Sequence, residues 1–412
     1  MNKKLILILT MFAVLVLALP VMAADNIMLN DHSYQPAQKI INQQGTSMMP
    51  LDMVNHIIGA TVAVENDTIK INKNGRILTM TLNKQDATFD AKTLKMPQAA
   101  IIINQQIYVP LRITLESFGA EVIWSSDAPL VIRYQDNRGE WTAENLMVES
   151  SRRMLEANTY RMDMDMNMDM DMLVKEDGKE VAQKMDAKYD VVAYNSNNPV
   201  QLYVIQKMKM NLPGIDTSGI PEITTESVIN EQGMYMKLPE QEWIKIDIEG
   251  LDMKALMQQS STQDPVAAMK LIKDLGMSTV FANDAERDGK KYYVIRSSAG
   301  NNIFQSEAMQ KIFNMPGINQ IPQLKEILDN IDLTMNYSTW INQETLYSEY
   351  MELQGTMFID LKIPDSEEQM KMNARMAAKY KISDFGTPIS VPDVSKAKEM
   401  DLSQLGNLTP SL

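Results

Sequence analysis

The stretch that decides the fold is MDMDMNMDMDM, residues 162–172, in which methionine alternates with Asp or Asn. A β-strand points successive side chains to opposite faces, so a strand here places the thioethers on one face and the acids on the other. The stretch therefore predicts a long strand in a sheet with one apolar face. On that face we expect Met162, Met164, Met166, Met168, Met170 and Met172.

The same alternation continues beyond this strand. After a predicted turn at Asp177-Gly178, strands are expected at Val181–Tyr194 and at Val200–Leu212, the latter carrying Met208 and Met210. Further strands are expected at Thr279–Arg287, Tyr292–Ser297 (after a turn at Asp288-Gly289), Leu333–Ile341, Leu346–Ile359 and Met370–Ile382. Helices are expected at Thr142–Glu156, with Thr142 as the N-cap, and at Leu251–Gln259, Pro265–Leu275 and Ile303–Asp329. The pattern indicates an α+β fold, a large curved antiparallel sheet, or half-barrel, wrapped around helices.

Upstream of this region, the sequence repeats itself at an offset of 60 residues. Pro50-Leu51 matches Pro110-Leu111, and Gly59-Ala60 matches Gly119-Ala120. Each copy has the pattern of a strand, a proline, a short helix, a glycine that ends the helix, and a second strand. The repeat predicts a small antiparallel domain of strands and helices.

The second copy is the more regular of the two. Pro110 suits the first turn of a helix, where its missing N–H is not needed, and Arg112 and Glu116 are spaced for an exposed ion pair. On the returning strand, Trp124 alternates with Val122, so we expect both side chains on one face.

Residues from about Ile27 to Tyr134 resemble the copper amine oxidase N-terminal-like domain, most specifically over Ile107–Trp124. Catalytic copper amine oxidases hold copper with three histidines and form their cofactor from a tyrosine. This chain contains only His32 and His56, and Asn336-Tyr337 is followed by Ser338 instead of an acid. We therefore expect no cofactor, no metal site in this domain and no enzymatic activity.

Residues from about Trp141 to Met400 resemble the LolA and LppX-like lipoprotein fold, in particular an uncharacterised bacterial family that shares it. The resemblance rests on the order of a helix, a methionine-rich strand, Glu242-Trp243-Ile244-Lys245, and Tyr380–Phe385 running into Ile389–Pro392. It implies a concave sheet that holds acyl chains or a lipidated protein. The chain has no Cys, so it lacks the lipobox cysteine of those lipoproteins.

The N-terminus predicts export. Lys3 and Lys4 precede an apolar run, Leu5–Leu19, and small residues end at Ala23, as in a cleaved signal peptide. We expect a signal peptide at 1–23, the copper amine oxidase N-terminal-like domain at 24–134, a linker at 135–141, the LolA/LppX-like domain at 142–400 and a tail at 401–412. The protein is expected in the periplasm, the cell wall or outside the cell, with no integral membrane span after cleavage.

The net charge of the chain limits the classes of partner that it can bind. The net charge of −14 becomes −16 without Lys3 and Lys4, which argues against nucleic acid as a partner. A lipid, a lipidated protein, or a cell-wall or surface protein is expected instead. The oligomeric state does not follow from the sequence.

The methionines allow three interpretations. In the first, the eight methionines named above line a core or a cavity, since Met is flexible and tolerates varied shapes. In the second, they bind Cu(I), a soft ion, although same-face neighbours on one strand stand roughly 6.6 Å apart. In the third, Asp165, Asn167, Asp169, Asp171 and Glu176 form a calcium loop, although Met170 stands where such a loop needs glycine.

These observations favour a non-enzymatic envelope protein. Its N-terminal domain would interact with a surface, and its C-terminal domain would bind an apolar ligand in a methionine-lined concavity. A structural or adhesion protein without a small ligand, and a Met-rich Cu(I)-binding protein, are the alternatives.

Overall fold

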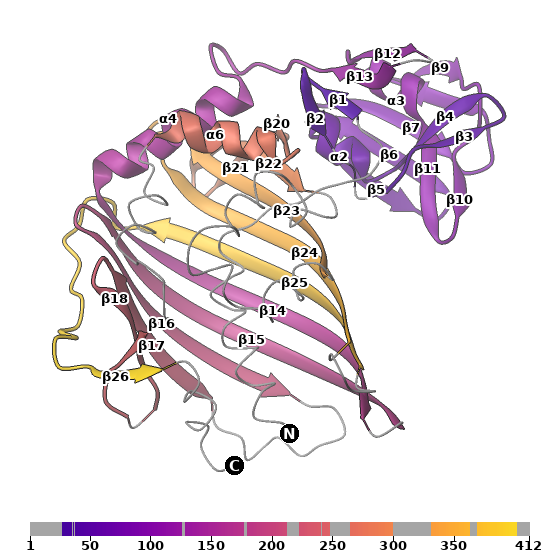
Figure 1. Ribbon diagram of the computed structural model, residues 1–412. Coiled ribbons are helices and arrows are strands. Elements are labelled where there is room, and N and C mark those ends of the chain that lie inside the picture. The colour runs from indigo at the N-terminus through magenta and orange to yellow at the C-terminus, as the bar shows by residue number, and fades with distance from the viewer. Residues whose placement is uncertain are drawn as a thin grey trace.

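The computed structural model describes residues 27–34, 36, 38–125, 128–176, 179–211, 222–239, 241–247, 264–299, 331–362 and 369–401. The predicted signal peptide, the Asp177-Gly178 turn and the helices expected at Leu251–Gln259 and Ile303–Asp329 lie outside these residues. Two bodies are visible in Figure 1, which we call the N-terminal module (residues 27–134) and the C-terminal module (residues 141–401).

The N-terminal module contains three small sheets, with strand orders β12-β13-β1-β2, β10-β11-β4-β3 and β5-β6-β7-β8-β9. All of their strand pairs are antiparallel except β1 with β13. The elements are β1 (Ile27–Leu29), β2 (His32–Tyr34), β3 (Ile41–Gln43), β4 (Thr46–Pro50), α2 (Met53–Ile58), β5 (Thr61–Glu65), β6 (Thr68–Lys73), β7 (Arg76–Thr81), β8 (Asp86–Phe89), β9 (Lys92–Lys95), β10 (Ile101–Ile103), β11 (Gln106–Pro110), α3 (Leu111–Ser117), β12 (Glu121–Ser125) and β13 (Ala128–Arg133).

The internal repeat appears as two equivalent strand-helix-strand units, β4-α2-β5 and β11-α3-β12. The expected Arg112–Glu116 ion pair forms, with 2.8 Å between Nη1 and Oε1. Pro110 is the extended N-cap of α3 and not its first helical residue. Trp124 is 65% exposed while Val122 is buried, and the pairing of β12 with β13 shifts register between the two, after Ile123; that the two side chains share a face stays a prediction.

The C-terminal module is built on a 13-stranded sheet in the order β20-β22-β23-β24-β25-β14-β15-β16-β17-β18-β19-β26, with β21 paired to β22. Figure 1 shows this sheet as one curved surface, which confirms the predicted fold class. Its strands are β14 (Thr159–Glu176), β15 (Lys179–Asn197), β16 (Val200–Asn211), β17 (Ile223–Asn230), β18 (Gly233–Lys237), β19 (Ile244–Asp247), β20 (Ser278–Phe281), β21 (Ala285–Arg287), β22 (Lys290–Ala299), β23 (Ile331–Asn342), β24 (Ser348–Lys362), β25 (Gln369–Ser383) and β26 (Lys398–Asp401).

Strand β14 occupies the middle of this sheet. It pairs along its length with β15, which follows it directly, and with β25, which lies near the end of the described chain. The alternation of Met with Asp and Asn is thus explained by a strand that has neighbours on both edges and different environments on its two faces.

Two described helices pack at one end of the sheet, α4 (Ala143–Ala157) and α6 (Pro265–Asp274) (Figure 1). Helix α4 begins at the predicted N-cap, Thr142, whose side chain accepts a hydrogen bond from the Asn145 N–H at 3.1 Å. Within the described residues, no helix combines the length and apolar character needed to cross a bilayer.

The segment that follows β25 packs against one face of β17 and β18. Val394 packs there with Val228 and Tyr235 in a small buried cluster, and Trp243 and Val391 lie against it. This contact places the end of the described chain back on the sheet.

The strand expected at Thr279–Arg287 is broken, since residues 282–284 separate β20 from β21. The break has a physical cause, because carbonyl groups of Phe281 and Ala282 accept hydrogen bonds from Lys73 and Arg138. A carbonyl oxygen engaged in this way anchors the chain to the N-terminal module and diverts it from a continuous strand.

Candidate functional sites: the methionine face and the inter-module network

All eight methionines predicted to line one face lie on the same side of the sheet. Met166, Met168, Met170, Met172, Met208 and Met210 are buried members of one apolar cluster, and Met162 and Met164 are partly buried against it. We call this surface the methionine face. The same cluster includes Leu275 and Met277, at the end of α6 and just after it.

Large and small side chains alternate across the methionine face. Met166 lies between Tyr189 of β15 and Ala378 of β25, and Met168 lies between Ala187 and Met376. Along the next pair, Met170 stands between Met185 and Ala374. Such alternation lets side chains of neighbouring strands interdigitate, as close packing requires.

Several residues of this face were not among the predicted site residues. Strands β23, β24 and β25 contribute Met335, Met357, Met372 and Met376, each buried in the same cluster. The sequence showed the two-residue alternation of these strands. It did not show which of them would pair with β14. The pairing of β14 with β25 brings together residues that are about 200 positions apart.

The opposite face of β14 is exposed and charged. Asp171 pairs with Lys184 across the strands, with 3.3 Å between Oδ1 and Nζ. Asp165 stands directly opposite Asp190, and the hydrogen bond between the two carboxyl groups raises the pKa of Asp165. Asp190 has its pKa lowered, chiefly by a hydrogen bond from Lys188.

The calcium interpretation does not hold. Asp165, Asn167, Asp169 and Asp171 lie in one continuous strand, so they cannot converge as the residues of a calcium-binding loop do. Among the described residues, no three His, Cys, Asp or Glu side chains are grouped closely enough to hold a metal ion.

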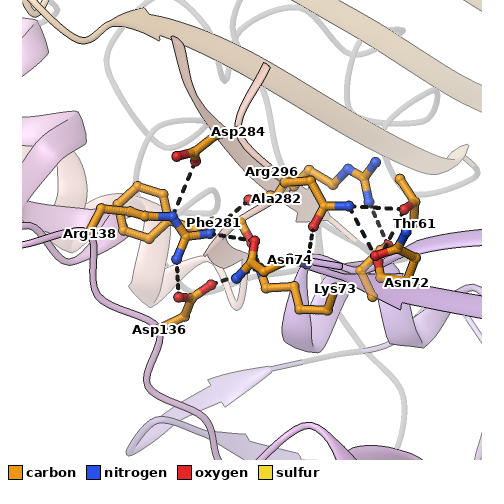
Figure 2. A network of polar contacts seen from close by, with 12 residues as sticks. Thr61, Asn72, Lys73, Asn74, Asp136, Arg138, Phe281, Ala282, Asp284 and Arg296 are labelled. Carbon is orange, nitrogen blue, oxygen red and sulfur yellow. Dashed lines mark hydrogen bonds and ion pairs between the residues drawn. The ribbon is translucent and has the colours of Figure 1, made fainter. Parts of the chain in front are cut away.

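A second site, absent from the sequence-based expectations, joins the two modules (Figure 2). The expected linker carries Asp136 and Arg138, which are only 13% exposed and are ion-paired with each other. The Arg138 guanidinium also contacts Asp284 at 3.2 Å and donates to Asn74 Oδ1 at 3.1 Å and to the Ala282 carbonyl at 3.2 Å. Its plane lies over the Phe281 ring, 4.9 Å from the centroid. The segment is therefore a fixed part of the interface and not a loose connection.

Lys73 is the buried cation of this network. Its Nζ lies 2.8 Å from Asp136 Oδ2 and donates to the Phe281 carbonyl, and its side chain is only 3% exposed. Burial lowers the pKa of Lys73 to about 8, although Asp136 acts in the opposite direction. Its sequence signal was its place in the alternation of β6, where Ile69, Ile71 and Lys73 all face the interior.

Backbone contacts complete the interface. Arg296 of β22 donates to the Ala60 carbonyl at 2.8 Å, and Asn283 donates to Thr61 Oγ1 at 3.1 Å and accepts from the Asn74 N–H at 2.8 Å. Gly59 permits this approach, because a Cβ at its position would lie 1.8 Å from the Phe281 carbonyl oxygen.

The two histidines are committed to protein contacts and do not form a copper site of the amine oxidase type. His32 Nε2 lies 3.2 Å from the Met277 carbonyl oxygen of the other module, and His56 Nδ1 lies 3.4 Å from the Tyr34 hydroxyl. Burial lowers the pKa of His56. Tyr337 lies within β23 and donates to the Met335 sulfur at 3.2 Å, as expected of an ordinary strand tyrosine.

Comparison with known families gives two matches. Residues 28–132 match the copper amine oxidase N-terminal domain, and residues 142–399 match a family of unknown function, DUF6612. No curated protein matches the chain.

Solved structures of similar proteins match 60–64% of the chain. LprF from Mycobacterium bovis is 12% identical, with 61% of this chain and 96% of that chain covered and a TM-score of 0.28. The lipoprotein LppX from Mycobacterium tuberculosis is 11% identical, with coverages of 60% and 99% and a TM-score of 0.27. A putative outer membrane lipoprotein-sorting protein domain from Vibrio parahaemolyticus is 12% identical, with coverages of 64% and 99% and a TM-score of 0.19.

Proposed function

Since the chain belongs to a family of unknown function, DUF6612, we propose its function from its own geometry: the C-terminal module binds a lipid or a lipidated partner on the methionine face. The N-terminal module is a surface-interaction unit, and the protein acts in the cell envelope without catalysing a reaction. The sequence of residues 1–23, which reads as an export signal, supports that location.

The observation that carries this proposal is the extent of the methionine face. The methionine-bearing part of its apolar cluster spans six neighbouring strands, from β16 to β23. At about 3.3 Å per residue and 4.8 Å per strand, it measures roughly 33 by 24 Å. An apolar face of that size cannot be left open to water, so it must be covered by a ligand, by other parts of the chain, or by both.

The side chains of this face suit a ligand of variable shape. Methionine has three rotatable bonds and a polarizable sulfur, and it adapts to irregular apolar surfaces better than branched side chains do. The chain contains 35 Met but only 8 Phe and 4 Trp. An acyl chain is an apolar ligand of this irregular kind.

The test is extraction of the purified mature protein with organic solvent, followed by mass spectrometry of the extract. Lipid at about one equivalent per chain supports the proposal. A fluorescent long-chain fatty acid is then added to the delipidated protein, and binding is followed by the increase in emission. Absence of both extracted lipid and fatty acid binding would overturn it.

Adjacent residues of β25 provide a matched pair of variants. Ala378 faces the methionine face between Leu353 and Met166, whereas Ala377 is exposed on the other face. We expect Ala378→Leu to weaken fatty acid binding, because the added methyl groups take up ligand space, and Ala377→Leu to leave it unchanged. Circular dichroism checks that both variants remain folded.

A structural role without a small ligand is favoured by one observation. Met166, Met168, Met170 and Met172 are each exposed by 4% or less. If the protein itself supplies the whole cover, the extract contains no lipid and Ala378→Leu destabilises the fold without changing any binding.

A further inference from the structure

We propose that the N-terminal module controls how firmly the methionine face retains its ligand, and that His32 is the positioning residue for this control. His32 holds the turn formed by Leu275, Gly276 and Met277, which we call the α6–β20 turn, against one edge of that face. The inference rests on the proposed function and adds a regulator to it, because it gives the N-terminal module a role in ligand retention.

The α6–β20 turn is part of the cover of the methionine face. Among the residues that the structure describes, every member of the apolar cluster belongs to a strand of the sheet, except for three. Leu275 and Met277 are buried in the cluster, and Ile272 of α6 packs against it. Figure 1 shows α6 beside β20, at the end of the sheet that the N-terminal module approaches. The position of this helix and turn therefore affects how open that end of the face is.

Strand register places the turn at the edge of the methionine face. Ser278, the first residue of β20, pairs with Ser298 of β22. The antiparallel register therefore brings Met277 beside Ala299, which is itself a buried member of the cluster. Ala299 pairs in turn with Met335 of β23. The Met277 side chain thus continues a row of cluster residues beyond the last strand of that row.

The turn and α6 form one unit. The Gly276 N–H donates to the Lys273 carbonyl at 2.8 Å, and the Met277 N–H donates to the Ile272 carbonyl at 3.2 Å, as in a helix C-cap. Gly276 has φ of +71°, the left-handed conformation that this cap uses. A displacement of the Met277 backbone is therefore passed on to the helix.

The N-terminal module holds this unit through His32 of β2. His32 Nε2 lies 3.2 Å from the Met277 carbonyl oxygen, and since a carbonyl only accepts, the ring N–H is the donor. Two residues later, Tyr34 is buried in the apolar cluster of the N-terminal module and anchors β2 there. The hydrogen bond therefore connects the core of one module to the cover of the methionine face on the other.

Two contacts within the C-terminal module also hold α6. Lys273 pairs with Glu144 of α4 at 2.5 Å, and Ser278 Oγ lies 2.5 Å from Ser298 Oγ. Neither contact involves the Met277 carbonyl, so His32 adds a separate constraint on the turn. If the two contacts were sufficient by themselves, removing the His32 side chain would change nothing at the turn.

The first test measures amide hydrogen exchange in the full-length mature protein without added ligand. His32→Ala should raise the exchange rate of residues 275–278 about fivefold, the effect expected for one net hydrogen bond. His32→Gln, whose side-chain amide can still donate, should restore protection.

Asn283→Ala is the matched control for this test. Asn283 also connects the two modules, through Thr61 and Asn74, but it lies beyond the other end of β20. Its loss should leave exchange at the turn as in the wild type. Unchanged exchange in His32→Ala, or an equal rise in both alanine variants, overturns the proposal.

The second test measures release of the fluorescent fatty acid when unlabelled fatty acid is added in excess. Release should be about fivefold faster from His32→Ala, and close to the wild-type rate from His32→Gln and Asn283→Ala. Faster exchange at the turn with an unchanged release rate overturns the role in retention.

Failure of the proposed function gives a different result. A wild-type protein that yields no lipid and binds no fatty acid overturns that function, and the role of His32 in retention is overturned with it. If the wild type binds fatty acid but release does not depend on His32, the proposed function stands and only the present inference fails.

Discussion

Gly59 and Phe281 bring the backbones of the two modules into close contact, since a Cβ on Gly59 would lie 1.8 Å from the Phe281 carbonyl oxygen. Gly59 also has φ of +64°, at the C-cap of α2. The residue thus ends a helix and admits the neighbouring module at the same point.

The first prediction follows from this approach. Gly59→Ala should separate the modules, because the added methyl group cannot coexist with the Phe281 carbonyl at its present distance. We expect faster proteolytic cleavage within residues 135–140 and a larger radius of gyration by X-ray scattering. Gly75→Ala is the control, because it has φ of +81° but no atom within 4 Å of the built Cβ. Equal cleavage rates in the two variants would show that the interface tolerates the methyl group.

The second prediction concerns how the unfolding free energy depends on pH. The pKa of Lys73 falls from 10.5 to about 8 on folding because of burial. Between these pH values the unfolded chain binds more protons, so the Lys73 contribution to the unfolding free energy increases as the pH is raised. Lys73→Met should reduce this increase in urea unfolding experiments. Lys70→Met, at an exposed position of the same strand, should preserve it. An unchanged slope in Lys73→Met would contradict the burial of a charged lysine.

A third prediction concerns Asp165 and Asp190, the carboxyl pair on the face of the sheet opposite the methionine face. Asp165 lies directly opposite Asp190, and its raised pKa means that its ionised form is disfavoured on folding. The contribution of Asp165 to the unfolding free energy therefore decreases as the pH rises through its pKa. Asp165→Asn should raise the unfolding free energy at neutral pH by about 0.2–1 kcal/mol, with a smaller gain near pH 4. Asp171→Asn removes an attractive contact with Lys184 instead and should not stabilise the protein.

The fourth prediction concerns packing around Gly355. Gly355→Ala would place a methyl group 2.9 Å from the Thr334 carbonyl oxygen and within 3.4 Å of Met335 Cγ. Overpacking of this kind costs about 1–3 kcal/mol of unfolding free energy. Calorimetry should show a clear decrease in melting temperature relative to Ala377→Gly on the exposed face of β25. A melting temperature of Gly355→Ala equal to that of the wild type would mean that the neighbouring Met335 and Met376 side chains move aside freely.

Features of the fold that depend on contacts between residues close in the sequence could be predicted, and features that depend on contacts between distant residues could not. The two-residue period of MDMDMNMDMDM predicted β14 and its apolar face, because side-chain direction in a strand is a local property. The Thr142 N-cap and the Asp288-Gly289 turn were likewise local and were confirmed. Whether the methionine face holds a ligand stays a prediction.

Partners distant in sequence could not be predicted in the same way. Met376 became a neighbour of Met168 only through the pairing of β25 with β14. The segment 135–140 looked like a linker because it is polar, but Arg138 binds Ala282 and Asp284, about 145 positions away in the sequence. The predicted strand Thr279–Arg287 failed for the same reason, since its interruption is caused by contacts with the N-terminal module.

The position of β14 between β15 and β25 also has a consequence for biogenesis. The β15 edge can pair as soon as a hairpin forms, but the other edge has no partner until residues 369–383 have been synthesised. A long strand with an unpaired edge and one apolar face is prone to associate with other chains. The nascent protein should therefore need a holding chaperone until its C-terminal strands emerge, and its high contact order should make folding slow.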